Sequence, residues 1–178
     1  METYKHKATN LVAQALENNG FRFHVNVVDE EEAEVISVAF SVKAGSRIEV
    51  LFIVRDDDTD IAARVYRVVT GVPKEKCARI TAECNRINND SRHIKFCLDD
   101  DRDINVEYDF LEATPDEAIG PMALEIMARM KRILDKEYVR IMQALYTDEP
   151  GDRGENPNIS DGEDGYDSEC GGVRYKES

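Results

Sequence analysis

The sequence lacks the patterns that usually mark a catalytic, cofactor or metal site. It has three histidines and no tryptophan, and it contains neither an HExxH motif nor a CxxC pair. The glycine patterns GxGxxG and GxxxxGK[ST], which hold dinucleotides and phosphates, do not occur either. We therefore predict no catalytic residue, no cofactor and no metal.

Long apolar runs and an excess of positive charge are missing as well. No stretch approaches the roughly 18 consecutive apolar residues of a membrane span, and the N-terminal METYKHKATN lacks the apolar centre of a signal peptide. The net charge of −14 disfavours a nucleic-acid backbone as ligand, because phosphate binding needs clustered lysine and arginine. We expect a cytoplasmic protein with no membrane partner and no nucleic-acid partner.

Cysteine is present without a pairing or metal-ligand pattern. Cys77, Cys84, Cys97 and Cys170 form no closely spaced pair, which is typical of reduced thiols in a cytoplasm. Cys77 and Cys84 fall on the apolar stripe of a predicted helix, where we interpret them as small core residues.

The acidic residues are concentrated at the C-terminal end. The last part of the chain, TDEPGDRGENPNISDGEDGYDSECGGVRYKES, has ten acids and three bases, so residues 147–178 carry −7 and residues 1–146 carry the other −7. A segment with so few aliphatic residues cannot bury enough apolar surface to offset its ordering entropy. We predict one domain over 1–146 and a disordered acidic tail over 147–178. A docking peptide around EDGYDSE is the alternative.

Apolar periodicity divides the domain into helices and strands. Spacing of three and four residues predicts three helices, over 4–19, 73–90 and 114–146. Alternation predicts four strands before the second helix and two after it, over 21–27, 36–42, 48–54, 61–69, 94–98 and 104–110. Short connections favour antiparallel pairing. The predicted fold is α+β, in the order α-β-β-β-β-α-β-β-α, with three helices packed on one face of a mostly antiparallel sheet.

The start of the last helix carries two local signals. The sequence TPDE offers Thr114 as an N-cap, a proline at the first helical position and Glu117 for a capping box. Gly120 and Pro121 follow within the helix. We predict that this pair kinks or restarts the helix near its beginning.

A DDDxDI pattern occurs twice, at residues 56–61 and 99–104. The alternate aspartates have the spacing of a calcium loop, but such a loop needs glycine at its sixth position and glutamate at its twelfth. Both segments have isoleucine at the sixth position, and Arg67 or Phe110 stands at the twelfth. Because aspartate suits turns, we predict two hairpin turns, with weak cation binding as the remaining alternative.

One part of the chain resembles a known family. The stretch from Val65 to Tyr108, VYRVVTGVPKEKCARITAECNRINNDSRHIKFCLDDDRDINVEY, is similar to the bacterial YbjN-like proteins. In these a strand leads into a helix that ends in an Asn-x-x-Asn element, here Asn85 and Asn88. A strand with a central aromatic follows, here Phe96, then an acidic turn and an alternating strand.

The resemblance implies a fold like that of the type III secretion chaperones. It also implies a small, non-catalytic, often dimeric cytoplasmic module that binds protein or acts in regulation, and it carries over no catalytic residue. The chain departs from the chaperone pattern, which usually has three strands before the second helix. We expect Asn85 and Asn88 to cap that helix and fix the exit of the chain, because asparagine competes well for free backbone groups.

These observations favour a non-catalytic, chaperone-like or regulatory protein-binding module that acts as a homodimer, with a partner of unknown identity. Two alternatives remain. One is an acidic mimic of nucleic acid that competes for a basic protein, which would need two rows of carboxylates on the folded body. The other is an enzyme that uses scattered carboxylates, which would need a pocket where titratable groups converge.

The expected interaction surface lies on the face of the sheet away from the helices. Alternation places Leu51 and Ile53 there on one strand, and Tyr66 and Val68 on the next. Four charged residues frame this cluster: Arg47, Glu49, Arg55 and Arg64. An apolar cluster surrounded by charge is what a dimer or a bound peptide would cover. The alternative is that the chain's own helices bury both sides of the sheet.

Overall fold

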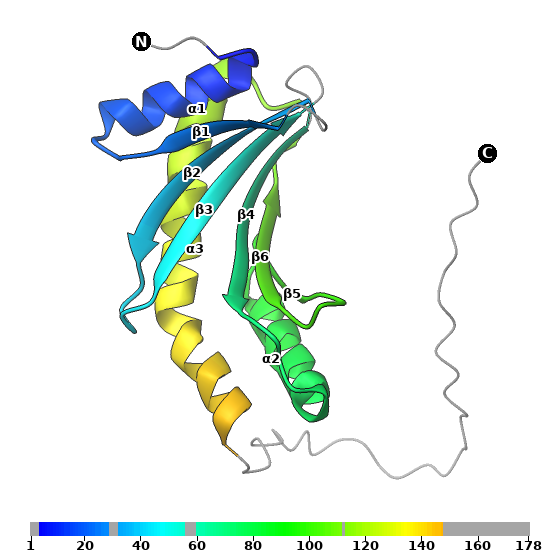
Figure 1. The fold of residues 1–178 in the computed structure, drawn as a ribbon. Helices are drawn as coiled ribbons and strands as arrows, with labels where there is room; N and C mark the ends of the chain where they lie inside the picture. The colour runs from blue at the N-terminus through cyan, green and yellow to red at the C-terminus, as the bar shows by residue number, and fades with distance from the viewer. Residues whose placement is uncertain (1–3, 29–31, 56–59, 112, 148–178) are drawn as a thin grey trace, which may run out of the picture.

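The computed structural model describes residues 4–28, 32–55, 60–111 and 113–147, which are built around an antiparallel sheet (Figure 1). Within these ranges the sheet has six strands: β1 (His24–Val28), β2 (Ala33–Ser41), β3 (Arg47–Arg55), β4 (Asp60–Val69), β5 (Lys95–Leu98) and β6 (Ile104–Asp109). Their order across the sheet is β1-β2-β3-β4-β6-β5. The β5–β6 hairpin joins the sheet through β6, which leaves β5 at the edge.

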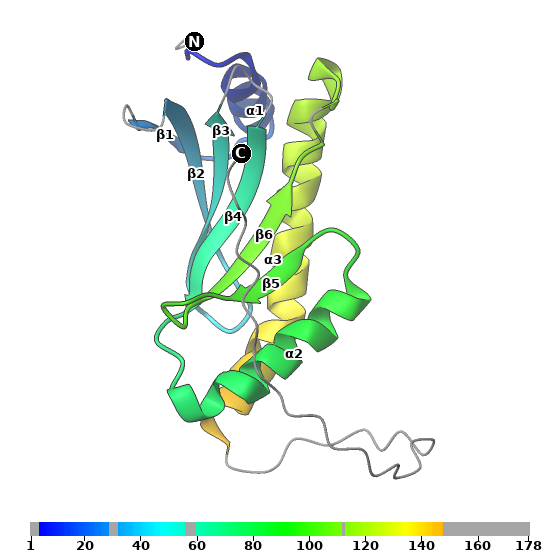
Figure 2. The ribbon, with the colours of Figure 1, turned by 90° about the vertical axis from the view of Figure 1, so that its right-hand side faces the viewer.

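Three α-helices of the described residues lie on one face of this sheet (Figure 2). They are α1 (Lys7–Asn18), α2 (Cys77–Asp90) and α3 (Asp116–Tyr146), and a short 3₁₀ turn (Lys74–Lys76) leads into α2. The long α3 runs beside the sheet, with α1 packed on its first half and α2 beside its second half. The predicted element order and α+β class are confirmed.

The main hydrophobic core fills the space between the sheet and the helices. Leu16 of α1, Ile80 of α2 and Met130 of α3 are fully buried in it. Each side chain of this size contributes about 1.5–3 kcal/mol when buried. Alternate residues of β3 also belong to this core, as their spacing predicted: Ile48, Val50, Phe52 and Val54.

The alternation of β4 is interrupted before its end. The pairing with β6 shifts between Val65 and Val69, and Arg67 between them has a positive φ of 56°. The Arg67 N–H donates a hydrogen bond to Oδ1 of Asn105 (2.9 Å). The irregularity turns Val68 to the inner face, where it belongs to the main core. The predicted placing of Val68 on the outer face is therefore wrong, because alternation holds only along an uninterrupted strand.

The beginning of α3 also differs from the prediction. The Thr114 hydroxyl donates to the Leu111 carbonyl (2.6 Å) instead of capping the helix, and Pro115 takes the N-cap position. The helix continues through Gly120 and the following proline. A Cβ on Gly120 would lie 2.9 Å from the Cβ of Ala15, so glycine here allows α1 and α3 to approach closely.

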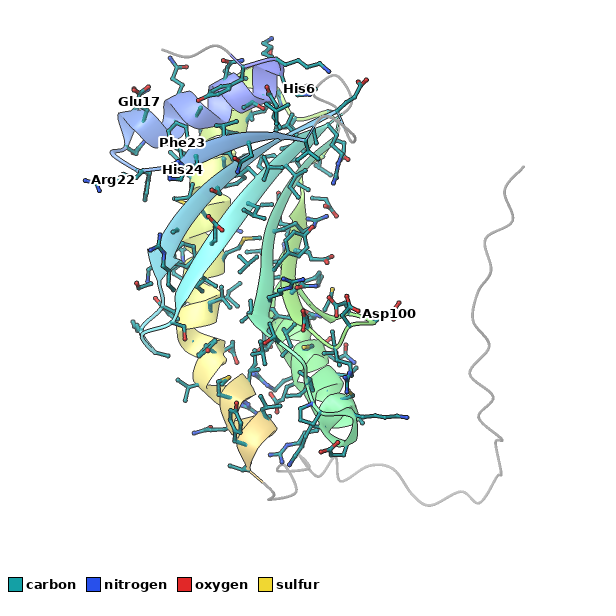
Figure 3. All side chains as sticks on the ribbon, in the orientation of Figure 1. His6, Glu17, Arg22, Phe23, His24 and Asp100 are labelled. Carbon is teal, nitrogen blue, oxygen red and sulfur yellow. The ribbon has the colours of Figure 1, made fainter. Side chains whose placement is uncertain are left out.

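The second DDDxDI segment forms the turn between β5 and β6, which confirms the predicted hairpin. The Asp103 N–H donates to the Asp99 carboxylate (2.7 Å) and lowers the pKa of Asp99. The Asp103 carboxylate accepts from the Gly71 N–H (2.8 Å), which ties the turn to the end of β4. Asp100 is exposed at the tip (Figure 3). The first DDDxDI segment lies mostly outside the described residues, as does the predicted tail from residue 148 onward.

Candidate partner-binding surfaces

The face of the sheet away from the helices carries a second, smaller hydrophobic cluster, which we name the outer cluster. Its members come from the first four strands: Val28, Ala33, Val35, Leu51, Ile53 and Ala62. The strand register sets Val35 beside Ile53, and Ile53 beside Ala62. The described helices leave this face uncovered (Figure 2). Within the outer cluster Ala33, Ile53 and Ala62 are buried, and Val28, Val35 and Leu51 are half-buried, so these three form the accessible part of the cluster on its four paired strands.

The structure brings together two of the four predicted interface residues. Leu51 and Ile53 both belong to the outer cluster, Leu51 half-buried and Ile53 only 6% exposed. Tyr66 is 46% exposed and lies outside the cluster, and Val68 belongs to the main core. The sequence reasoning missed Val35, although it follows from the alternation that places its neighbour Ile36 in the main core.

Charged residues at the edge of the outer cluster are held by ion pairs. Arg55 lies 3.5 Å from Asp60 on the neighbouring strand. Arg64 donates to the Tyr108 carbonyl (2.8 Å) and forms an ion pair with Asp109. Two of the four predicted framing residues are therefore fixed in position, and the rim carries both signs of charge.

A cleft of about 620 Å³ opens between α3 and the segment that joins α2 to β5. Ile94 and Ile126 are buried in its floor. His93 and Tyr108 also line it, with their ring centroids 6.3 Å apart in an edge-to-face arrangement. The cleft has the size and apolar floor of a site for a small molecule or for an anchoring side chain of a partner.

Several titratable side chains line this cleft: Asp90, Arg92, His93, Glu125 and Arg129. Arg129 donates to Glu125 (2.7 Å) and holds the pKa of that carboxyl below its usual range. A carboxylate stabilised in its charged form is a weaker base. The contact therefore does not prepare Glu125 for proton transfer, although titratable groups do converge here as the enzyme alternative requires.

Two buried carboxylates were not singled out from the sequence. Glu34 of β2 is 2% exposed and accepts hydrogen bonds from the backbone N–H groups of Lys5 (2.8 Å) and His6 (3.0 Å). His6 is the N-cap residue of α1 (Figure 3), so a strand residue satisfies the amides that precede the helix. The sequence signal that could have identified Glu34 is a single acidic residue at an inward-facing position of an otherwise apolar strand.

Glu137 of α3 is the second buried carboxylate, at 4% exposure. It forms ion pairs with Arg86 of α2 and with Lys136 (3.0 Å). Burial raises the pKa of Glu137, but the hydrogen bonds from these two cations outweigh burial and leave the pKa below its usual range. This group joins two helices and does not line the cleft.

The two asparagines of the Asn-x-x-Asn element have different environments. Asn88 donates to the Phe96 carbonyl (2.9 Å) and accepts from the Phe96 N–H (2.8 Å), so it satisfies the free edge of β5 as a neighbouring strand would. Lys95 Nζ donates to the Asn88 and Ser91 carbonyls at the end of α2. Asn85 is exposed. Asn88 therefore fixes the exit of the chain, as expected, and the capping contacts at the helix end come from Lys95.

The described residues contain no group of three or more His, Cys, Asp or Glu side chains placed to hold a metal ion. No described helix is both long and apolar enough to span a membrane. The described cysteines Cys77, Cys84 and Cys97 are unpaired, and burial raises the pKa of the Cys84 thiol to about 11.

Comparison with known protein families identifies a family for most of the described fold. The family model YbjN, described as "Putative bacterial sensory transduction regulator", matches residues 9–119, which is more than half of the 178-residue chain. The chain belongs to the YbjN family. The YbjN match runs from α1 into the beginning of α3 and so includes the whole described sheet and the outer cluster. Searches among curated proteins and among solved structures gave no match.

The YbjN description supports a regulatory or binding role for the chain. It names regulation and no chemical reaction. The YbjN match ends near the start of α3, so the second half of that helix and the acidic segment beyond it lie outside the matched region.

Proposed function

We propose that this YbjN protein is a non-catalytic cytoplasmic regulator that works by binding protein, and that it forms a homodimer through the outer cluster. The observation that carries the proposal is the outer cluster on the helix-free face, whose half-buried members Val28, Val35 and Leu51 reach the surface above the buried Ile53. The three unpaired thiols support the cytoplasmic location, since cysteines remain reduced there.

The rim of the outer cluster supports pairing with a second copy. In a two-fold dimer the same patch lies on both sides of the interface, so each patch must be complementary to itself. The Arg55–Asp60 and Arg64–Asp109 pairs place both signs of charge around an apolar centre. Two copies can therefore bury their apolar centres and still set opposite charges against each other.

The environment of the carboxylates favours a binding module over an acidic mimic of nucleic acid. A mimic presents its carboxylates to a basic partner, whereas Glu34 and Glu137 are buried and hydrogen-bonded within the fold. Asp99 and Asp103 are bonded within the β5–β6 turn and to the end of β4. Glu34, Asp103 and Glu137 are buried within the fold and are not available as a charged surface.

The test combines Leu51→Asp with Tyr66→Asp in the full chain. We expect the parent to be a dimer by light scattering at micromolar concentration, and the double variant to be a monomer with unchanged circular dichroism. Val139→Asp is the matched control, because Val139 is 52% exposed on α3 and far from the sheet's outer face. If the double variant unfolds, Leu51→Ser, a milder change at a half-buried member of the outer cluster, gives the same test. A monomeric parent, or a double variant that still dimerises, would overturn the proposal.

A further inference from the structure

The two edges of the sheet end in different ways. At the β5 edge, Asn88 forms two hydrogen bonds with the backbone of Phe96, as a neighbouring strand would. At the other edge, β1 is the outermost strand and pairs only with β2 (Figure 1). Among the described residues, the backbone groups of β1 on the side away from β2 form no hydrogen bond. The chain therefore closes one edge of its sheet with a side chain and leaves the other edge open.

The sequence of β1, HVNVV, lacks the features that commonly protect an edge strand. Natural edge strands are protected by lysine, proline or a bulge, whereas β1 has none of these and its register with β2 is continuous. Three of its residues are exposed: His24, Asn26 and Val27. Val27 is 61% exposed although its side chain is apolar and β-branched. An open, uncharged strand rich in valine is suited to pairing with a further strand.

We propose that β1 pairs with β1 of a second copy, antiparallel and around a two-fold axis, so that two sheets join edge to edge. The axis passes beside Asn26, the middle residue of the five-residue strand. This register places Asn26 beside its own copy, and it pairs the remaining positions as His24 with Val28 and Val25 with Val27. Alternate backbone groups of a strand point to the same side, and either alternate set of β1 is symmetric about Asn26. Both copies therefore satisfy their free backbone groups in the same way, as an isologous interface requires.

The side chains of β1 are complementary to themselves in this register. The exposed Val27 lies beside Val25 of the other copy, which makes a β-branched pair of the kind that stabilises neighbouring strands. On the other face of the strand, His24 lies beside Val28 of the other copy, and Val28 belongs to the outer cluster. Edge pairing therefore covers the most exposed apolar side chain of β1.

The charges at the two ends of β1 favour a second copy as the occupant of this edge. Arg22 precedes the strand, is exposed and points away from the fold (Figure 3). Residues 29–32, which follow the strand in the sequence, are four acids. Antiparallel pairing brings the Arg22 end of each copy to the acidic end of the other, whereas parallel pairing would bring like charges together. Two copies of β1 are therefore also complementary in charge.

Edge pairing is a second interface, separate from the outer cluster on the face of the sheet. A pair of five-residue strands buries less than about 1,200 Å², the lower limit of the stable interfaces that proteins form. We therefore expect edge pairing to be weak. It would join outer-cluster dimers only at concentrations well above those at which the dimer itself forms.

Cysteine cross-linking in the full chain detects such a weak contact and reads its register. The buried Cys84 is kept, and the other thiols are first replaced: Cys77→Ser, Cys97→Ser and Cys170→Ser. With Asn26→Cys, the Cα atoms of the two copies lie about 4.5–5.5 Å apart across the axis, which a disulfide spans. With His24→Cys, on the same face of the same strand, they lie about 13 Å apart along the strand, which no disulfide spans.

We expect covalent dimers to form at least ten times faster from Asn26→Cys than from His24→Cys under mild oxidation, as followed on non-reducing gels. The variant Asn85→Cys, at an exposed asparagine of α2, measures random collision between copies. Equal rates for Asn26→Cys and His24→Cys, or a rate for Asn26→Cys no faster than for Asn85→Cys, would overturn the proposal.

A charge placed on the edge gives the second test. Val27→Lys sets an ammonium group against Val25 of the other copy, so it should slow the cross-linking of Asn26→Cys at least tenfold with unchanged circular dichroism. Val139→Lys is the matched control, because Val139 is 52% exposed on α3, and it should leave the rate unchanged. An equal effect of the two lysines would contradict edge pairing.

The same cross-linking separates this interface from the outer-cluster dimer. Leu51→Ser weakens the outer cluster and lies outside β1. The rate for Asn26→Cys should be the same with and without Leu51→Ser, so edge pairing can succeed where the outer-cluster dimer fails. A rate that falls with Leu51→Ser would assign the cross-link to the outer cluster and overturn edge pairing.

Discussion

Replacing Arg86 or Glu137, which form an ion pair between α2 and α3, should change the stability of the fold by unequal amounts. Glu137 is 4% exposed, whereas the side chain of Arg86 is 29% exposed and also contacts Glu83 and Asp90. Replacing Arg86 by methionine leaves a buried carboxylate with Lys136 as its remaining cation. Replacing Glu137 by glutamine leaves an arginine that keeps two other carboxylates. The first change should therefore destabilise the fold more than the second.

The expected magnitudes follow from the exposure of each group. Removing one partner of a fully buried pair costs about 3–5 kcal/mol. Because Arg86 is partly exposed and Lys136 remains, we expect about 2–3 kcal/mol for Arg86→Met. For Glu137→Gln we expect about 1 kcal/mol, the net value of a typical hydrogen bond. Urea unfolding at pH 7 measures both values, and a larger cost for Glu137→Gln would contradict the reasoning.

The pH dependence gives an independent check. In the parent, the folded-state pKa of Glu137 lies below its usual range, so the pair contributes stability above pH about 4.3, the unfolded pKa. That stability is lost as the pH falls through the lowered pKa. In the Arg86→Met variant the burial of Glu137 is no longer offset by Arg86, so the pKa of Glu137 is raised. Protonation of Glu137 as the pH falls from 7 toward 5 then removes the buried charge and its cost to the stability of the variant. The stability difference between parent and variant should therefore shrink over this interval. An equal difference at pH 7 and pH 5 would refute the assignment.

Two further predictions concern the edge strand and the acidic turns. Asn88→Ala removes both hydrogen bonds to the Phe96 backbone and should lower the free energy of unfolding in urea by about 1–3 kcal/mol. The control Asn85→Ala, at an exposed position, should change it by less than about 0.5 kcal/mol. Equal effects would show that Asn88 does not secure β5. Asp57→Asn with Asp100→Asn should leave the melting temperature unchanged with or without calcium, because we expect these residues only to reverse the chain. A calcium-dependent rise in the parent that the variant abolishes would establish a cation site.

The sequence alone determined the order and type of the elements. Hydrophobic spacing is a local property, and it placed Ile48, Val50, Phe52 and Val54 on the inner face and Leu51 and Ile53 on the outer one. The end of α1 at Asn18 agrees with the helix predicted over 4–19, and Gly20 follows it with the left-handed φ of 73° that is common after a helix. The hairpin turn at the second DDDxDI segment followed from the turn preference of aspartate.

The tertiary structure decided whatever depends on residues far apart in the chain. Val68 turns inward because the β4–β6 pairing shifts beside Arg67, and alternation within one strand holds no information about that shift. Glu34 caps the start of α1 from β2, which no local capping pattern describes. Arg86 meets Glu137, 51 residues further along the chain, because α2 packs beside the second half of α3. Local spacing sets which way each side chain points, but only packing sets what it meets.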